Sequence, residues 1–392
     1  MPDDGSQDPQ FPFGGMPFLN DMMKAMAAQG PLNWDLATQA AAAGARGENA
    51  DPEPDPTVRL AFNSLADIAD LHVQNATGLP TGPRGSHAEI HTTTRAIWAH
   101  RTLQDLRPLF NGLAGALNSA QPAAQSDDPM ASMFASMSSL LFPSLMGITI
   151  GSMIGSLASR AFGQYDLPIP RPNATDILVV PHSVDTFATD WSINHDDLRM
   201  WVLAHELTSH AVLSSPAARD GLLASITAYV TAFRPDAEAF MNGLGDLDPS
   251  DPSAMETLQR KLSDPMMLVG AIRSAEQEAL QPVLDARVAA VTAYIDSTVD
   301  SVAARLLGNH APIAEAVRRR RLDSRTEADL AERLLGVSLS RELQQRGRAF
   351  VAGVEERGGE GALRPMLTDP AKLPTPAELD APGLWLARLE IQ

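Results

Sequence analysis

The chain contains no cysteine among its 392 residues. Disulfide bonds and thiolate metal sites are therefore excluded. Positive charge is also scarce, since 48 acidic residues outnumber 30 basic ones and the formal net charge is -18. Phosphate backbones and anionic lipids select for lysine and arginine, so we expect no nucleic-acid partner.

An export signal is missing from the first residues as well. Asp3 and Asp4 stand where a secretory signal carries positive charge, and no apolar segment follows them. The lack of cysteine fits a cytosolic protein, so we expect a cytoplasmic location. The sequence also has no internal repeat, no glycine-rich phosphate loop and no Gly-x-Ser-x-Gly elbow.

Hydrophobic residues make up 44% of the chain, which is enough to bury a sizeable core. Residues 1–55 are rich in glycine, proline and aspartate, and this composition predicts a flexible arm. The exception is an alanine-rich stretch near 33–43, which predicts a short helix that Asn33 caps and Gly44 ends. We expect the folded domain to cover residues 56–392.

Helical spacing of apolar residues dominates this domain. Residues 57–75 form one such helix, with an apolar set of Leu60, Leu65, Ile68 and Leu71. Residues 92–118 form another, in which Pro108 predicts a kink or a break. One short apolar run, at residues 177–180, predicts a strand. The expected fold class is therefore mainly α with a small β element.

A long uncharged segment lies between Asp128 and Arg160. Its length would suffice to span a bilayer. However, serine recurs, proline interrupts, and glycine repeats at every fourth position, at Gly147, Gly151 and Gly155. Small residues at this spacing let helices approach closely, in soluble cores and in membranes alike. We favour a buried helix of a soluble protein and keep membrane association through residues 130–158 as a weaker hypothesis.

The C-terminal tail, from residue 373, contains Pro374, Pro376 and Pro382. These prolines predict an extended segment. We expect Trp385 and Leu386 to anchor it to the body of the domain.

The motif with most chemistry in it is WVLAHELTSHAV, at residues 201–212. Asn194, with Asp197 three residues later, predicts the start of its helix. The His205-Glu206 pair is typical of the His-Glu-x-x-His signature, in which two histidines bind zinc and the glutamate activates a bound water. Positions four residues apart point only about 40° apart around a helix, so both rings reach one ion.

Here the second histidine is displaced. Ser209 stands four residues after His205, and His210 follows at about 140° around the helix. A π-bulge between the two histidines would restore the angle. The alternative is that His205 is an ordinary core histidine and that Glu206 pairs with His210 one turn on.

Several segments together resemble a known family. They are GPLNWDLA near Trp34, DLHVQNATGLP near Gly78, GQYDLPIP at residues 163–170, WVLAHELTSHAV, YIDSTVDSVAARLLG at 294–308, RRRR at 318–321 and PTPAELDAPGLWLA at 374–387. The chain is similar in these segments to the zincin-like hydrolases common in actinobacteria, which are often labelled zinc-dependent metalloproteases. The resemblance covers most of the chain after about residue 30.

This resemblance implies a zincin-like helical domain with zinc held by two histidines and by an acidic residue of a later helix. His205 matches the first ligand and Glu206 the catalytic base. Ser209 falls at the second ligand position, unless a bulge brings in His210. Thr292 falls at the acidic position, and Asp296, one turn on, is a weak substitute. Two ligand positions are thus altered together, which favours relaxation of the metal site.

Other candidate residues have simpler interpretations. The single histidines His182, His195 and His310 are expected to be satisfied or exposed. His87 and His91 have the spacing of a helical metal pair, but nearby glycine and proline favour a loop. The run of arginines at 318–321 predicts a solvated helix end, where positive charge suits the helix dipole.

The sequence leaves two functions open. The first is a zinc metallopeptidase-like hydrolase, acting on an unidentified peptide or protein with Glu206 as general base and with His205, a displaced His210 and Asp296 on zinc. The second is a catalytically inactive zincin-fold protein that serves as a binding or scaffold module.

Overall fold

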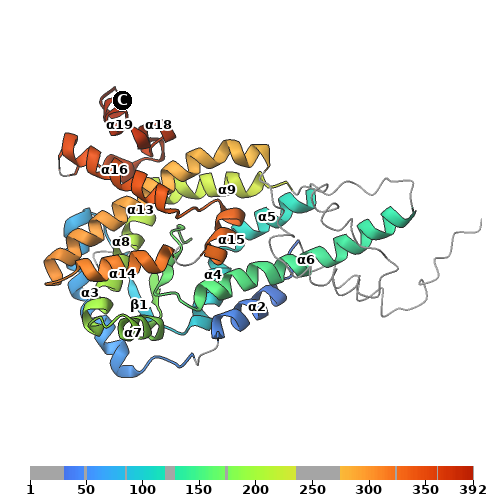
Figure 1. Cartoon of the computed structure of the whole chain (residues 1–392), viewed down its shortest axis with the longest axis horizontal. Coiled ribbons are helices and arrows are strands. Elements are labelled where there is room, and N and C mark those ends of the chain that lie inside the picture. The colour runs from blue at the N-terminus through green and yellow to red at the C-terminus, as the bar shows by residue number, and fades with distance from the viewer. Residues whose placement is uncertain are drawn as a thin grey trace, which may run out of the picture.

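The computed structural model describes residues 31–47, 51–83, 86–119, 129–172, 175–234, 274–322, 325–359 and 361–391. Most of these residues are helical, and β1 (Glu89–Thr92) and β2 (Asp176–Val179) form a two-stranded parallel sheet (Figure 1). The expected class, mainly α with a small β element, is confirmed. The predicted arm is described only from residue 31, so its first 30 residues lie outside these ranges.

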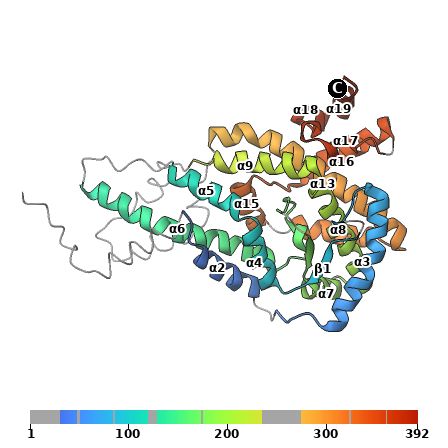
Figure 2. The same cartoon turned by 180° about the vertical axis from the view of Figure 1, so that it is seen from behind.

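The predicted N-terminal helix is part of the folded body. It is α2 (Trp34–Arg46), and the side chain of Asn33 caps it by accepting a hydrogen bond from the amide of Leu36. It lies alongside α6 (Pro129–Ala158) in both views (Figures 1 and 2). Ala37, Ala41 and Ala45 on one face of it, and the preceding Leu32, are buried. Helix α2 is therefore packed into the folded body, although the predicted division placed it in the arm, and the boundary at residue 56 stays a prediction.

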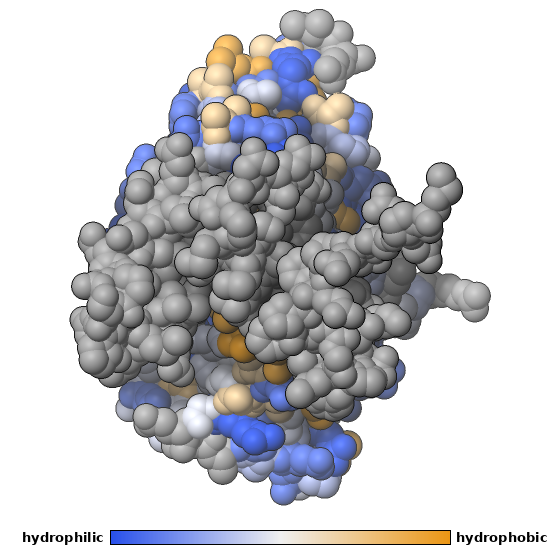
Figure 3. Space-filling view, turned by 90° about the vertical axis from the view of Figure 1, so that its right-hand side faces the viewer, coloured by the Kyte–Doolittle hydropathy of each residue, from blue (hydrophilic) through white to orange (hydrophobic). Residues whose placement is uncertain are grey.

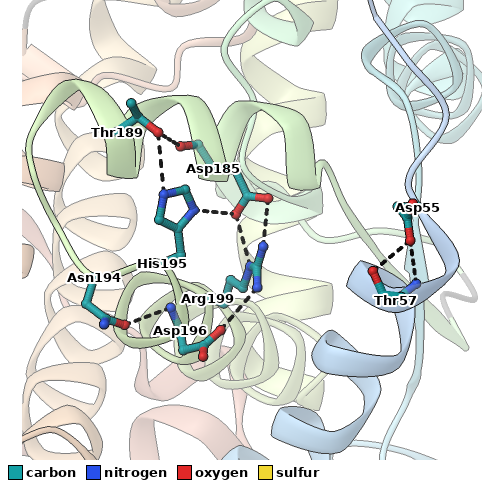
Figure 4. Close-up of polar contacts among 8 residues, drawn as sticks. All are labelled: Asp55, Thr57, Asp185, Thr189, Asn194, His195, Asp196 and Arg199. Carbon is teal, nitrogen blue, oxygen red and sulfur yellow. Dashed lines mark hydrogen bonds and ion pairs between the residues drawn. The ribbon is translucent and has the colours of Figure 1, made fainter.

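The helix expected at 57–75 is α3 (Pro56–Thr77), but it turns a different face to the core. Asp55 caps it, accepting hydrogen bonds of 2.7 Å from the amide and the hydroxyl of Thr57 (Figure 4). The expected apolar set is largely exposed, at 67% for Leu60, 47% for Ile68 and 60% for Leu71. The buried face consists of Phe62, Ala66, Ala69 and Val73. Helical spacing allowed both stripes, and packing against α8 decided between them.

The next helix breaks as predicted. Helix α4 (Arg95–Asp105) ends at Leu106, and α5 (Arg107–Ser119) begins immediately before Pro108. Strand β1 pairs with β2 in the register Glu89 to Asp176. This pairing places His91 in an extended strand, so it cannot share an ion with His87 as a helical pair would.

Helix α8 (His195–Leu213) is the centre of the body, and nearly every residue from Leu198 to Leu213 is buried. α3 packs on one side of it and α13 (Ala275–Leu306) on another (Figure 2). The remaining elements are η2 (Gln164–Asp166), α7 (Pro181–Asp190), the π-turn η3 (Ala217–Leu222), α9 (Leu223–Thr231), α14 (Ala311–Leu322), α15 (Arg325–Leu335), α16 (Arg341–Gly358), α17 (Pro365–Thr368) and η4 (Pro370–Lys372).

The tail is helical, not extended as its prolines suggested. It forms α18 (Pro376–Asp380) and α19 (Pro382–Ile391), because Pro376 and Pro382 each stand at the first helical position, where the missing N–H is not needed. Trp385 is fully buried, and its indole N–H donates to the carbonyl oxygen of Lys372 at 2.8 Å. The predicted anchoring by Trp385 is therefore confirmed.

Helix α6 contributes Met146, Ile150, Met153 and Ile154 to the core, as expected of a buried helix. Of the helices in the described ranges, none is both long enough and apolar enough to cross a bilayer. In the view towards the end of the molecule where α6 lies, hydrophilic residues prevail at the bottom of the face, and hydrophilic and hydrophobic residues are mixed at the top (Figure 3).

Candidate metal-site region

Polar contacts at its first turn fix the orientation of α8. The Asn194 side chain accepts hydrogen bonds from the amides of Asp196 and Asp197, which confirms the predicted cap (Figure 4). Arg199 donates to both carboxylate oxygens of Asp185 on α7, at 3.0 and 2.8 Å. The ring of His195 lies 3.3 Å from the same carboxylate, so this histidine ties α7 to α8.

A small cavity of about 30 Å3 lies where α8, α13, α14 and η2 meet. Its volume is about that of one water molecule. Its lining includes four of the residues singled out from the sequence, namely His205, Ser209, Thr292 and Asp296. The structure therefore brings together the positions that the family resemblance assigned to one metal site.

His205 is held on all sides in this region. The indole of Trp201 stacks on its ring, with the centroids 5.5 Å apart and the planes within 10°. Its Nδ1 lies 3.1 Å from Oε1 of Glu206, and its Nε2 lies 2.6 Å from Nη2 of Arg321. Because a guanidinium only donates, Nε2 must accept and Nδ1 must carry the proton. Both ring nitrogens are thus engaged.

Arg321 is the residue that sequence reasoning missed. Besides His205, its guanidinium contacts Oδ1 of Asp296, at 3.0 Å from Nη1. Burial is the largest single effect on the pKa of Arg321 and lowers it, but the charge and the hydrogen bond of Asp296, together with the charges of Asp166 and Glu206, raise the pKa overall. The side chain therefore remains a cation between the candidate histidine and the candidate carboxylate. The only signal for Arg321 in the sequence was its position in the run of arginines at 318–321, one of the segments that resemble the family.

The arginine run is not a solvated helix end, except at Arg319, whose side chain is 61% exposed. Arg320 lies over the ring of Phe162, 3.5 Å from its centroid, and pairs with Asp166 at 3.3 Å. Arg318 pairs with Asp300. The expectation was wrong because these side chains reach back from the last turns of α14 to carboxylates of α13 and η2.

The carboxyl group of Glu206 points at the backbone of η2. Only 1% of this residue is exposed, and its Oε2 accepts a hydrogen bond of 2.9 Å from the amide of Tyr165. A Cβ added to Gly163 would lie 2.3 Å from the carboxyl carbon, so glycine is needed there. Burial raises the pKa of Glu206. Glu206 does not line the cavity beside His205.

His210 has a separate environment. Helix α8 is α-helical from His195 to Leu213, so the bulge that would turn His210 towards His205 is not there. Its Nδ1 lies 2.9 Å from the hydroxyl of Tyr165, and burial lowers its pKa to about 4. The alternative pairing of Glu206 with His210 is also absent, because Glu206 contacts His205 instead.

The donors at the cavity do not fit a zinc ion. The buried hydroxyl of Ser209 has no hydrogen-bond partner in the described structure, and that of Thr292 donates to the carbonyl oxygen of Val288 at 2.7 Å. A zinc site in a protein uses three or four nitrogen, sulfur or carboxylate ligands. Within the described ranges, no three His, Cys, Asp or Glu side chains come together in a way that could hold a metal ion. This includes the surroundings of the single histidines His182 and His310.

Comparison with known proteins identifies the fold and the family. Residues 32–386 match the sequence profile of the zincin-like metallopeptidases. The chain belongs to the zincin-like metallopeptidase family. This family member is also similar to a crystal structure described as "a putative hydrolase with a novel fold" from Chloroflexus aurantiacus, with a TM-score of 0.57 and 20% identity over 92% of this chain and 99% of that one. No curated protein matches the chain.

Proposed function

We propose that this protein is a non-catalytic member of the zincin-like family, in which an arginine takes the place of the metal ion and the fold serves to bind a partner. The observation that supports this proposal best is the position of Arg321, whose guanidinium contacts both His205 and Asp296.

The charge balance of the site supports this proposal. A zinc ion requires the lone pair of a histidine and the charge of a carboxylate. Arg321 already contacts both His205 and Asp296. It supplies one positive charge where zinc would supply two, and it forms hydrogen bonds where zinc would form coordination bonds. Bringing zinc to the same ligands would place a divalent cation against a partly buried guanidinium, at an electrostatic cost.

The position of the glutamate supports it as well. A general base must come within hydrogen-bond reach of the proton that it removes. Glu206 is held by Tyr165 and His205 and is turned away from the cavity. The hydroxyl of Thr292 donates to the carbonyl oxygen of Val288, and that of Ser209 has no hydrogen-bond partner in the described ranges, so neither is hydrogen-bonded to a base that would activate it as a nucleophile.

The second candidate is a zinc-dependent hydrolase of peptide or amide bonds, with Glu206 as base and with His205 and Asp296 among the metal ligands. The family match over residues 32–386 favours it. It requires Arg321 to leave both of its partners.

Zinc content after equilibration with the metal distinguishes the two candidates. We expect the wild-type protein to hold far less than one equivalent. Combining Arg321→Ala with Ser209→His and Thr292→Glu supplies two ligands and removes the competing cation, so this triple variant should bind about one equivalent of zinc.

Arg319→Ala, a change to the exposed neighbour of the buried arginines, should leave the zinc content at the wild-type level. About one equivalent in the wild-type protein, lost in His205→Ala, would overturn the proposal. So would chelator-sensitive cleavage of peptides by the wild-type protein.

A further inference from the structure

A second and larger cavity, of about 550 Å3, lies between the last turns of α14 and the first turns of α16. We call it the arginine groove. Its lining residues are mostly cationic or amide side chains, namely Glu315, Arg318, Arg319, Arg341, Gln344 and Arg348. Its volume lies within the range of about 300–1,000 Å3 that is usual for ligand pockets.

The groove concentrates positive charge in an acidic chain. Four arginines line it against one glutamate, whereas the whole chain carries a formal net charge of -18. Arg318 and Arg319 each have a carboxylate partner, Asp300 and Glu315 respectively. In the described ranges no ion pair forms at Arg341 or Arg348, although the charge of Arg341 helps to lower the pKa of Glu315 and Nε of Arg348 donates to the carbonyl oxygen of Gln344 at 3.2 Å.

These two arginines lie in the N-terminal half of α16. Ser340 caps α16 by accepting a hydrogen bond from the amide of Leu343. Arg341, Gln344 and Arg348 follow at intervals of three and four residues and so share one face of the helix. The distance from Arg341 to Arg348 along the helix axis is about 10 Å. The positive charge is therefore spread along the groove and does not converge on one point.

The groove also adjoins the cavity at His205. Gln344 lines both of them, from the same turn of α16. A ligand lying in the groove would thus be separated only by the side chain of Gln344 from the cavity that Arg321 and Asp296 line.

We propose that the arginine groove binds an acidic peptide segment in an extended conformation, with its carboxylates paired to Arg341 and Arg348. Spaced carboxylates match arginines spread over about 10 Å better than one compact phosphate would. The net charge of the chain does not prevent this, because distant charges are screened beyond about 8 Å at 0.15 M salt. The proposal rests on the proposed function, since it takes the peptide to be bound and not cleaved.

Fluorescence anisotropy of labelled hexaglutamate with the full chain tests this proposal. We expect saturable binding at low salt that weakens as salt is added, and no binding of labelled hexaglutamine. Combining Arg341→Glu with Arg348→Glu should weaken binding at least about tenfold. Arg357→Glu, a change on the same helix but outside the groove, is the matched control and should bind like the wild type.

Equal binding by the wild type and the double variant, with both folded by circular dichroism, would overturn the proposal, as would a lack of binding by the wild type. Displacement of the peptide by pyrophosphate at equal concentration would also overturn it, in favour of a small-anion site. These outcomes leave the zinc measurement unaffected. A high zinc content with intact peptide binding would reject the proposed function alone.

Discussion

At the scale of single residues, the partner of a side chain decides its role more than its type does. His205 and His210 are both buried on α8, five positions apart. His205 contacts Arg321 and Glu206, whereas His210 contacts the hydroxyl of Tyr165. The sequence shows two histidines near one glutamate, but only the neighbouring elements distinguish the ring that lines the cavity from the ring that does not.

The pH dependence of stability should report on His210. Its pKa is lowered from 6.5 to about 4 by burial, so the unfolded chain takes up the proton first on acidification. The stability that this residue contributes is present above pH 6.5 and is lost as the pH falls towards 4, by on the order of 3 kcal/mol. In His210→Asn the amide oxygen can still accept from Tyr165, so we expect a shallower loss of unfolding free energy over this range.

Urea unfolding at several pH values measures this effect. His100→Asn, on the exposed side of α4, controls for the loss of one histidine. Parallel pH profiles for His210→Asn and the wild type would contradict the assignment.

At the scale of elements, glycines determine how closely two helices approach. The repeat at Gly147, Gly151 and Gly155 faces α2, and the carbonyl oxygens of Asn33, Ala37 and Ala41 lie where side chains would otherwise be. The spacing in the sequence predicted a close helix contact, and this is confirmed. It did not show that the partner would be the alanine-rich segment assigned to the arm.

Gly151→Ala should therefore destabilise the protein. The added Cβ would lie 2.2 Å from the carbonyl oxygen of Ala37, so α2 would have to move away from α6. We expect a loss of about 1–3 kcal/mol in unfolding free energy, typical of overpacking.

Gly115→Ala in α5 is the matched control, because nothing lies within 4 Å of its added Cβ. It should be neutral or slightly stabilising, since alanine favours the helix. A Gly151→Ala variant as stable as Gly115→Ala would show that the two helices are not in close contact.

At the scale of the whole molecule, the last helix of the chain, α19, packs onto α16. Helix α19 lies beside α16 (Figure 1), and Trp385 on α19 packs edge-to-face against Phe350 on α16, with the ring centroids 5.6 Å apart. The same helix, α16, lines the arginine groove with its first turns. The tail therefore supports an element of the proposed binding site.

Trp385→Ala should lower the unfolding free energy by about 3–5 kcal/mol, because it removes a fully buried indole and its hydrogen bond. Leu384→Ala, at the adjacent residue that is 55% exposed, should change it by less than about 0.5 kcal/mol. Thermal unfolding of the two variants provides the measurement, and similar melting temperatures would contradict the packing of α19.

Much of the candidate site was predictable, since His205, Ser209, Thr292 and Asp296 were all expected at one place and all line one cavity. That expectation came from the family resemblance. The role of Arg321 could not be predicted, because its partners are 25 and 116 positions away in the chain. The zinc and the cytoplasmic location remain predictions.

The sequence alone determined the helical class, the helix caps at Asn33 and Asn194 and the break before Pro108, because these depend on residue type and local spacing. The tertiary structure decided which face of α3 is buried, which histidine lines the cavity and where the arginines of α14 point. Those features depend on charges and surfaces that meet only when distant segments pack together.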